Sequence, residues 1–280
     1  MAEHDRQVST LARELRFFPS DVRDGASLKA QDVAIFNELG YLSGIQALAP
    51  DEVARIRDGF DALLTHFIAS GRDGYAIDRY QDRIALIHDI ALHPRILDAV
   101  SDLLGPDVVC WATHFFCKMP GDPRRISWHQ DCSYWALSPS KTVTVWLAID
   151  DVDEDNGCMQ CIPASHLHGH LPWRETDDGD ANVLTQVIDD IGRLGTPVNI
   201  ELAAGEMSLH SDLLVHGSHP NMSARRRCGL TLRYCPPDVR AYWGWNEHSI
   251  ICRGSDSSGH WVDVPRPPDG AALEFRADGA

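Results

Sequence analysis

The sequence predicts a mainly β fold with flanking helices, arranged as a small β-barrel or sandwich. Amphipathic helical patterns occur in the N-terminal third, whereas from residue 106 short runs of β-branched and aromatic residues alternate with Gly, Pro, Asp and Asn. Because the helical patterns stay on one side of the sequence, we expect the helices to buttress the β core. The 280 residues suit one domain, with a helical part at about 1–105, a β core at about 106–240 and an irregular cover at 241–280.

Two helices and six strands are predicted in detail. From Asp51 apolar residues recur at three- and four-residue steps until Gly71, and a second helix spans Pro94 to Leu104 before Gly105. The predicted strands are Val108 to Met119, Thr142 to Ile149, Met159 to Ile162, Val198 to Leu202, Glu206 to His210 and Gly229 to Tyr234.

Charge and apolar patterning exclude several classes of protein. Asp and Glu outnumber Lys and Arg by 41 to 25, so the formal charge of −16 disfavours binding to nucleic acid. The charged N-terminal segment lacks a signal-peptide core, and no apolar run is long enough to span a membrane. We therefore expect a soluble cytoplasmic protein without a membrane partner.

The eight cysteines are expected to be buried free thiols, because a chain of this size does not need disulfides for stability. Cys158 and Cys161 form a CxxC motif, which can mark zinc or a redox pair. A second pair at zinc-finger spacing is missing, so the motif is weak evidence for either function.

A candidate metal site is formed by Trp128-His129-Gln130-Asp131 and the later His216. In a strand, residues two apart point to the same side, so His129 and Asp131 could offer a nitrogen and an oxygen to one ion. His216 follows 87 residues later, far enough for several strands to return it to this pair. Three protein ligands leave open positions, as iron(II) oxygenases require.

Other histidines offer weaker alternatives. His210-Ser211-Asp212 repeats the HxD pattern, but its histidine partners lie in the same short segment, which disfavours it as the metal site. The run of His166, His168 and His170 is interpreted as surface or hydrogen-bonded core residues rather than a storage site.

Three consecutive arginines, Arg225 to Arg227, precede the strand Gly229 to Tyr234. Such a cluster is usually a solvated turn, and we expect this for two of the three. One guanidinium directed into the barrel would provide a bidentate receptor for a carboxylate.

Taken together, these segments resemble the phytanoyl-CoA dioxygenase family of iron(II)- and 2-oxoglutarate-dependent oxygenases. The resemblance rests on the combination of FNELGY at 36–41, WHQD at 128–131, TVWLAIDDVDEDNGCMQCIPASH at 142–166, GEMSLH at 205–210, HGSHPN at 216–221 and RRRCGLTLRY at 225–234. It implies a double-stranded β-helix, or jelly roll, with Fe(II) as cofactor and 2-oxoglutarate and O2 as cosubstrates. A histidine, His219, stands where the family commonly has glycine, and its role is open.

The resemblance also implies roles for individual residues. His129, Asp131 and His216 correspond to the iron ligands, and Arg227 with Ser218 to the receptor for the distal carboxylate of 2-oxoglutarate. Trp146 corresponds to a residue lining the cosubstrate pocket, although plain core packing explains it equally well.

The implied reaction is hydroxylation of a small-molecule metabolite with release of succinate and CO2. Candidate substrate-pocket residues are Lys118, Trp128, Tyr134, Trp135 and Arg233, with the aromatic segment 242–245 as a further wall or lid. Their basic and aromatic character would suit a small anionic substrate.

Several alternatives remain. The same iron chemistry could give epimerisation, cyclisation or desaturation, and no residue pattern separates these from hydroxylation. A non-catalytic cupin-like binding module is disfavoured by Arg227 and Ser218, and a zinc hydrolase by the absence of an HExxH motif. A monomer or a homodimer fits the sequence.

Overall fold

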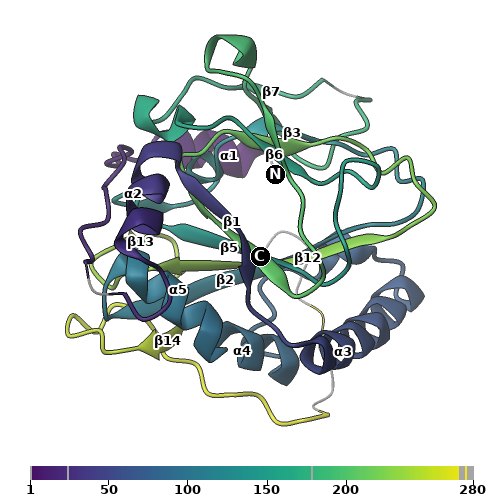
Figure 1. The fold of residues 1–280 in the computed structure, drawn as a ribbon, viewed down its shortest axis with the longest axis horizontal. Coiled ribbons are helices and arrows are strands. Elements are labelled where there is room, and N and C mark those ends of the chain that lie inside the picture. The colour runs from purple at the N-terminus through teal and green to yellow at the C-terminus, as the bar shows by residue number, and fades with distance from the viewer. Residues whose placement is uncertain (1, 24, 178, 271–274, 276–280) are drawn as a thin grey trace.

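The computed structural model describes residues 2–23, 25–177, 179–270 and 275, and Figure 1 shows β-sheets with most of the helices gathered along one side. The α-helices are α1 (Ala2–Ser9), α2 (Ala30–Leu39), α3 (Pro50–Ala69), α4 (Ala85–Ala91) and α5 (Pro94–Leu104). Single 3-10 turns are η1 (Gly74–Ala76), η2 (Asp131–Ser133), η3 (Ser165–His168) and η4 (Ile191–Arg193).

The larger sheet has six antiparallel strands in the order β1-β10-β5-β12-β2-β14. Their bounds are β1 (Tyr41–Gln46), β10 (Glu206–Ser211), β5 (Val143–Ala148), β12 (Arg227–Cys235), β2 (Val108–Lys118) and β14 (Ile250–Arg253). Side chains along β12 alternate between two environments, as the period of a strand requires. Cys228, Leu230 and Leu232 enter the hydrophobic core, whereas Arg227 and Arg233 line an interior cavity.

Helices α2 to α5 cover the outer face of this sheet (Figure 1). Apolar residues of α3 at helical spacing, including Phe60 and Phe67, join strand residues such as Phe115 in one buried cluster. Pro50 and Pro94 begin α3 and α5, where the missing amide hydrogen costs no hydrogen bond. The helices therefore support the sheet from outside and leave its inner face for the cavity.

The smaller sheet has four antiparallel strands in the order β3-β11-β6-β9. Their bounds are β3 (Ile126–His129), β11 (His216–Ser218), β6 (Met159–Cys161) and β9 (Val198–Ile200). Two minor ribbons pair β4 (Leu137–Ser138) with β13 (Arg240–Ala241) and β7 (Arg174–Glu175) with β8 (Gln186–Val187). Two opposed antiparallel sheets with helices outside agree with the jelly roll.

Two strands of the larger sheet lie outside the predicted β core. β1 belongs to the part expected to be mostly helical, and β14 to the part expected to be irregular. β1 contains Gly44 and is interrupted by a register shift between Leu42 and Ile45. β14 has only four residues. Neither segment therefore has a strong strand pattern of its own. Pairing with β10 and β2, respectively, determines their conformation.

In the described part of the chain, every helix is too short or too polar to cross a lipid bilayer.

Candidate functional site

His129 and His216 lie directly opposite each other in the smaller sheet. His129 is the last residue of β3 and His216 the first of β11, and the antiparallel register pairs the two. The expected same-strand placement of Asp131 is wrong, because β3 ends at His129 and Asp131 begins η2. The turn nevertheless directs the carboxylate toward both histidines, so the three side chains meet.

The three side chains converge on one point. Asp131 Oδ1 lies 3.5 Å from His129 Nε2 and 3.9 Å from His216 Nε2. All three residues are buried, and one ligand atom from each lies within 4.8 Å of the others. A single ion can be bound by all three after small side-chain movements.

Backbone hydrogen bonds determine which imidazole nitrogens are available. His129 Nδ1 lies 2.8 Å from the carbonyl of Ser127, and His216 Nδ1 lies 2.9 Å from the carbonyl of Leu214. Because a carbonyl oxygen can only accept, each Nδ1 carries the hydrogen and donates it. Both Nε2 atoms are then lone-pair donors facing Asp131, which is the tautomer that a metal ligand needs.

The charge states also suit a metal. Burial, followed by the nearby His129, lowers the pKa of His216 well below its usual value, so this ring stays neutral. Burial alone would raise the pKa of Asp131, but its close contacts with the neighbouring histidines and the nearby Arg233 charge hold it well below the usual range. The site therefore offers a neutral imidazole at His216 and a carboxylate at Asp131, beside the imidazole of His129.

His210, set aside as part of a weaker HxD pattern, lies beside this cluster. Its Nε2 is 3.7 Å from Asp131 Oδ2, and its ring centroid is 4.8 Å from that of His216. Neither ring nitrogen has a hydrogen-bond partner among the described residues. Its strand position could have revealed this, because Met207 and Leu209 face the core and His210 therefore faces inward.

The predicted carboxylate receptor lies in the same cavity. Arg227 is 2% exposed, donates from Nε and Nη2 to the carbonyl of Gly157 at 3.0 and 2.9 Å, and donates from Nη2 to Ser218 Oγ at 3.2 Å. None of the described carboxylates pairs with it. Burial lowers the pKa of this guanidinium, so an anionic ligand would compensate a costly buried charge.

Of the two preceding arginines, Arg225 is exposed as predicted for a solvated turn, whereas Arg226 is mostly covered and lies over the Phe60 ring. Arg225 pairs with Asp153, and Arg226 pairs with Asp150 and Asp61. Arg227 is thus the member of the cluster that points inward.

Trp146 both packs in the core and lines the cavity. It belongs to a buried apolar cluster and lines the cavity, with the Arg227 guanidinium 5.3 Å from its ring centroid. Gly229, a residue that sequence reasoning missed, makes room for this ring, since an added Cβ would lie 2.2 Å from Trp146 Cζ2.

The predicted substrate-pocket residues separate into three locations. Arg233 lines the cavity with the triad, while Trp135 and Tyr134 pack beside it, the Tyr134 ring centroid lying 5.9 Å from that of His129. Lys118 is buried near Arg227, where Nζ donates to Ser218 Oγ at 2.8 Å and to the carbonyl of His219. Trp128 points away from the cavity, because it alternates with His129 on β3 and packs against a separate apolar cluster.

The remaining motifs are structural. Cys158 and Cys161 are buried free thiols, in agreement with the expectation for the CxxC. His166 packs edge-on against Phe17, and His170 lies 3.1 Å from Ser133 Oγ. His219 is exposed beside Ser218.

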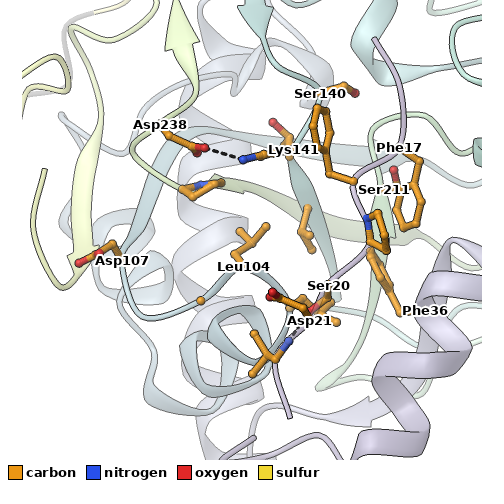
Figure 2. Close-up of a pocket in the computed structure, with 18 of the residues that line it drawn as sticks. Phe17, Ser20, Asp21, Phe36, Leu104, Asp107, Ser140, Lys141, Ser211 and Asp238 are labelled. Atoms are coloured by element: carbon orange, nitrogen blue, oxygen red, sulfur yellow. Dashed lines mark hydrogen bonds and ion pairs between the residues drawn. The ribbon is translucent and has the colours of Figure 1, made fainter. Parts of the chain in front are cut away.

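A larger cavity of about 370 Å3 shares no lining residue with the triad cavity (Figure 2). Its wall includes Phe17, Phe36 and Leu104, and its charged residues are Lys141, Asp238, Asp21 and Asp107. Lys141 pairs with Asp238, Asp107 accepts from the Ser255 amide, and the described wall has no histidine, so the triad cavity is the better candidate for chemistry.

Comparison with known proteins decides the family. The phytanoyl-CoA dioxygenase (PhyH) family model matches residues 36–229, more than half of the chain. The chain belongs to the phytanoyl-CoA dioxygenase family. The peroxisomal phytanoyl-CoA dioxygenase of Bos taurus is 22% identical to this chain over 295 residues, and the alignment covers 94% of this chain and 79% of the bovine protein.

Solved structures agree with this membership. A non-heme monooxygenase, ThoJ, superimposes with a TM-score of 0.70 at 28% identity, with 84% of this chain and 87% of ThoJ covered. The α-ketoglutarate-dependent carbocyclase SnoK from nogalamycin biosynthesis has the same fold, with a TM-score of 0.65 at 20% identity over 89% of this chain and 97% of SnoK. The predicted jelly roll and the predicted class of enzyme, a 2-oxoglutarate-dependent non-haem iron dioxygenase, are confirmed.

Proposed function

We propose that the chain hydroxylates a small-molecule metabolite, with His129, Asp131 and His216 as ligands of Fe(II). The observation that carries the proposal is the pair of Nδ1–H donors to backbone carbonyls, which leaves both Nε2 atoms directed toward Asp131. The donor set of two imidazoles and one carboxylate is the one that non-haem iron oxygenases use. When bound, iron with 2-oxoglutarate and O2 supplies the oxidising power for attack on a C–H bond.

The protein's part is to bind and orient the cosubstrate. Arg227 and Ser218 hold the distal carboxylate of 2-oxoglutarate, and the Trp146 ring covers the guanidinium on one side. Gly157 fixes the guanidinium through its carbonyl, and Lys118 fixes Ser218. The buried walls exclude bulk water, which strengthens every charge interaction in the cavity.

Hydroxylation is favoured over epimerisation, cyclisation and desaturation because a relative named as a hydroxylase, the L-proline trans-4-hydroxylase of Streptomyces griseoviridis, is 27% identical over 160 residues. The carbocyclase fold match shows that this architecture also accommodates ring closure. Product mass separates hydroxylation, which adds one oxygen, from epimerisation, which leaves the mass unchanged, and from desaturation and ring closure, which each remove two hydrogens. NMR of the product then distinguishes a new double bond from a new ring.

The test is anaerobic absorbance spectroscopy of the purified protein with Fe(II) and then 2-oxoglutarate. Wild type should develop a visible charge-transfer band, and Arg227→Met should require at least about 100-fold more cosubstrate to form it, because a buried carboxylate would lose its charged partner.

Arg225→Met is the matched control, because Arg225 belongs to the same cluster but pairs with Asp153 at the surface. It should titrate like wild type. A wild-type protein that binds Fe(II) without forming the band would contradict the proposal and favour a cupin-like binding module.

We also propose a cytoplasmic location and a monomeric or homodimeric state. Eight free cysteines support a reducing compartment. Cell fractionation and sedimentation velocity test the two parts, and a secreted protein or a larger oligomer would contradict them.

A further inference from the structure

Strand β12 carries two inward-facing arginines. Arg227 and Arg233 share a face because their positions differ by six, an even number, and both line the triad cavity. Six residues of strand span roughly 20 Å, so the two arginines start from well-separated points of the strand. Arg227 serves the cosubstrate in the proposed function, which leaves Arg233 without an assigned partner.

The Arg233 side chain has few partners among the described residues. Its Nε is buried without a hydrogen-bond partner, and none of the ion pairs or side-chain hydrogen bonds of the described residues involves it. The nearby Asp78 pairs instead with Arg79 at 3.3 Å and His114 at 3.7 Å. Arg233 is half-buried and none of the described carboxylates lies within ion-pair distance of it, so an anionic ligand in the cavity could pair with its guanidinium.

A second hydrogen-bond donor without a partner among the described residues, the Trp111 indole, lies near Arg233. Trp111 is 1% exposed, and its indole Nε1 has no acceptor among the described residues. The Arg233 guanidinium carbon lies 5.8 Å from the Trp111 ring centroid and 5.1 Å from that of Trp135. Buried indole N–H groups normally find a partner, so two unmatched donors in one cluster point to an acceptor supplied from outside.

The surroundings define the rest of such a ligand. Trp111 and Trp135 pack edge to face at 4.8 Å, and Trp245 lies 5.6 Å from Trp111. These indoles form an apolar wall next to the guanidinium, and the Arg233 charge is close enough to Asp131 to influence its carboxylate. A ligand held here would therefore present its apolar part near the metal ligands.

We propose that Arg233 and the Trp111 indole form a receptor for a carboxylate of the primary substrate, which is then a small carboxylic acid with an apolar body. This inference rests on the proposed function and names its substrate class. Arg233 binds the carboxylate, the tryptophans contact the apolar body, and a neighbouring C–H bond of the substrate is presented to the metal site.

The test uses the anaerobic Fe(II)·2-oxoglutarate protein with phenylacetate and 3-phenylpropionate as probes, each compared with its neutral amide. Tryptophan fluorescence and the visible band report binding. We expect at least one carboxylate to bind about tenfold more tightly than its amide, because a charged pair in a desolvated site is stronger than a neutral one. Arg233→Met should abolish that preference, and Trp111→Phe, which keeps an aromatic ring but removes the N–H, should weaken it.

Arg240→Met is the control, because Arg240 is exposed and donates to Ser258. It should keep the wild-type preference. Equal binding of acids and amides to wild type, a preference that survives in Arg233→Met, or loss of the band through competition with 2-oxoglutarate would each overturn the inference. Absence of the band in wild type before any probe is added would instead contradict the proposed function.

Discussion

At the scale of single residues, buried charge determines what the cavity can bind. Lys118 is fully buried beside Arg227, and burial, followed by the Arg227 charge, lowers its pKa to about 6. Without cosubstrate this lysine is therefore mostly neutral at pH 7.5. A bound carboxylate would favour the charged form and raise the pKa again.

This shift predicts a pH-dependent affinity for 2-oxoglutarate. Above pH 6 the cosubstrate complex holds more protons than the free protein, so affinity should fall as pH rises, by up to about tenfold per unit. Below about pH 6 both states are protonated at Lys118 and this dependence should level off. Calorimetry in buffers of different ionisation enthalpy should detect proton uptake on binding at pH 7.5.

Lys118→Met should remove this proton uptake, whereas Lys141→Met, altered at a lysine paired with Asp238, should retain it. Identical proton uptake in wild type and Lys118→Met would show that another group titrates.

Sequence reasoning found the residues with strong motifs and missed those that act through their surroundings. His129, Asp131, His216 and Arg227 were expected to meet in one cavity, and they do. His210 was set aside because an HxD pattern is judged by its own spacing, whereas its proximity to Asp131 depends on the register of β10. Trp128 adjoins His129 in the sequence and is therefore predicted to line the pocket. Side chains alternate along β3, however, so Trp128 points away from the cavity.

At the scale of elements, strand β12 contributes to both the hydrophobic core and the cavity. Its outward residues build the core, and its inward residues include Arg227, Gly229 and Arg233. Gly229 is required by a close approach rather than by backbone conformation, because the Trp146 ring occupies the space of its missing side chain.

Gly229→Ala should displace Trp146 and disturb the guanidinium beside it. We expect an affinity for 2-oxoglutarate lower by roughly tenfold and a modest loss of stability, of about 1–3 kcal/mol, as for other overpacked interiors. Titration of the visible band and chemical denaturation measure the two effects. Gly192→Ala is the matched control, since an added Cβ there meets nothing within 4 Å. A Gly229→Ala protein with wild-type titration would show that the Trp146 position is not coupled to the cosubstrate.

The sequence predicts the strands that are rich in β-branched and aromatic residues. β2, β5, β6, β9, β10 and β12 all coincide with predicted segments to within a few residues. Short β1 and β14 were not predictable, because their stability comes from neighbouring strands rather than from their own composition. The turn at Asp131 was missed for a similar reason, since the hydrogen bond from the Cys132 amide to the Asp212 carbonyl links it to a distant segment.

At the scale of the whole molecule, the metal site joins parts of the chain that are distant in sequence. Ligands that bind the folded protein alone stabilise it by mass action. Saturating metal and 2-oxoglutarate at about 100 times their dissociation constants should each add close to 2.7 kcal/mol to the free energy of unfolding.

The stabilisation should appear as a higher melting temperature with Fe(II), or with Mn(II) as a redox-stable substitute. Asp131→Ala should lose the metal-dependent shift, whereas Asp238→Ala, altered at a surface carboxylate paired with Lys141, should keep it. A full shift in Asp131→Ala would remove Asp131 from the ligand set.

The pairing of His129 with His216 has a consequence for biosynthesis. The two residues are adjacent across a strand ladder but 87 positions apart in the chain. A nascent polypeptide that has not yet extended beyond residue 216 cannot complete the three-ligand set, however well its earlier segments have folded. Iron capture by all three ligands therefore waits until residue 216 has been synthesised and β11 has paired with β3.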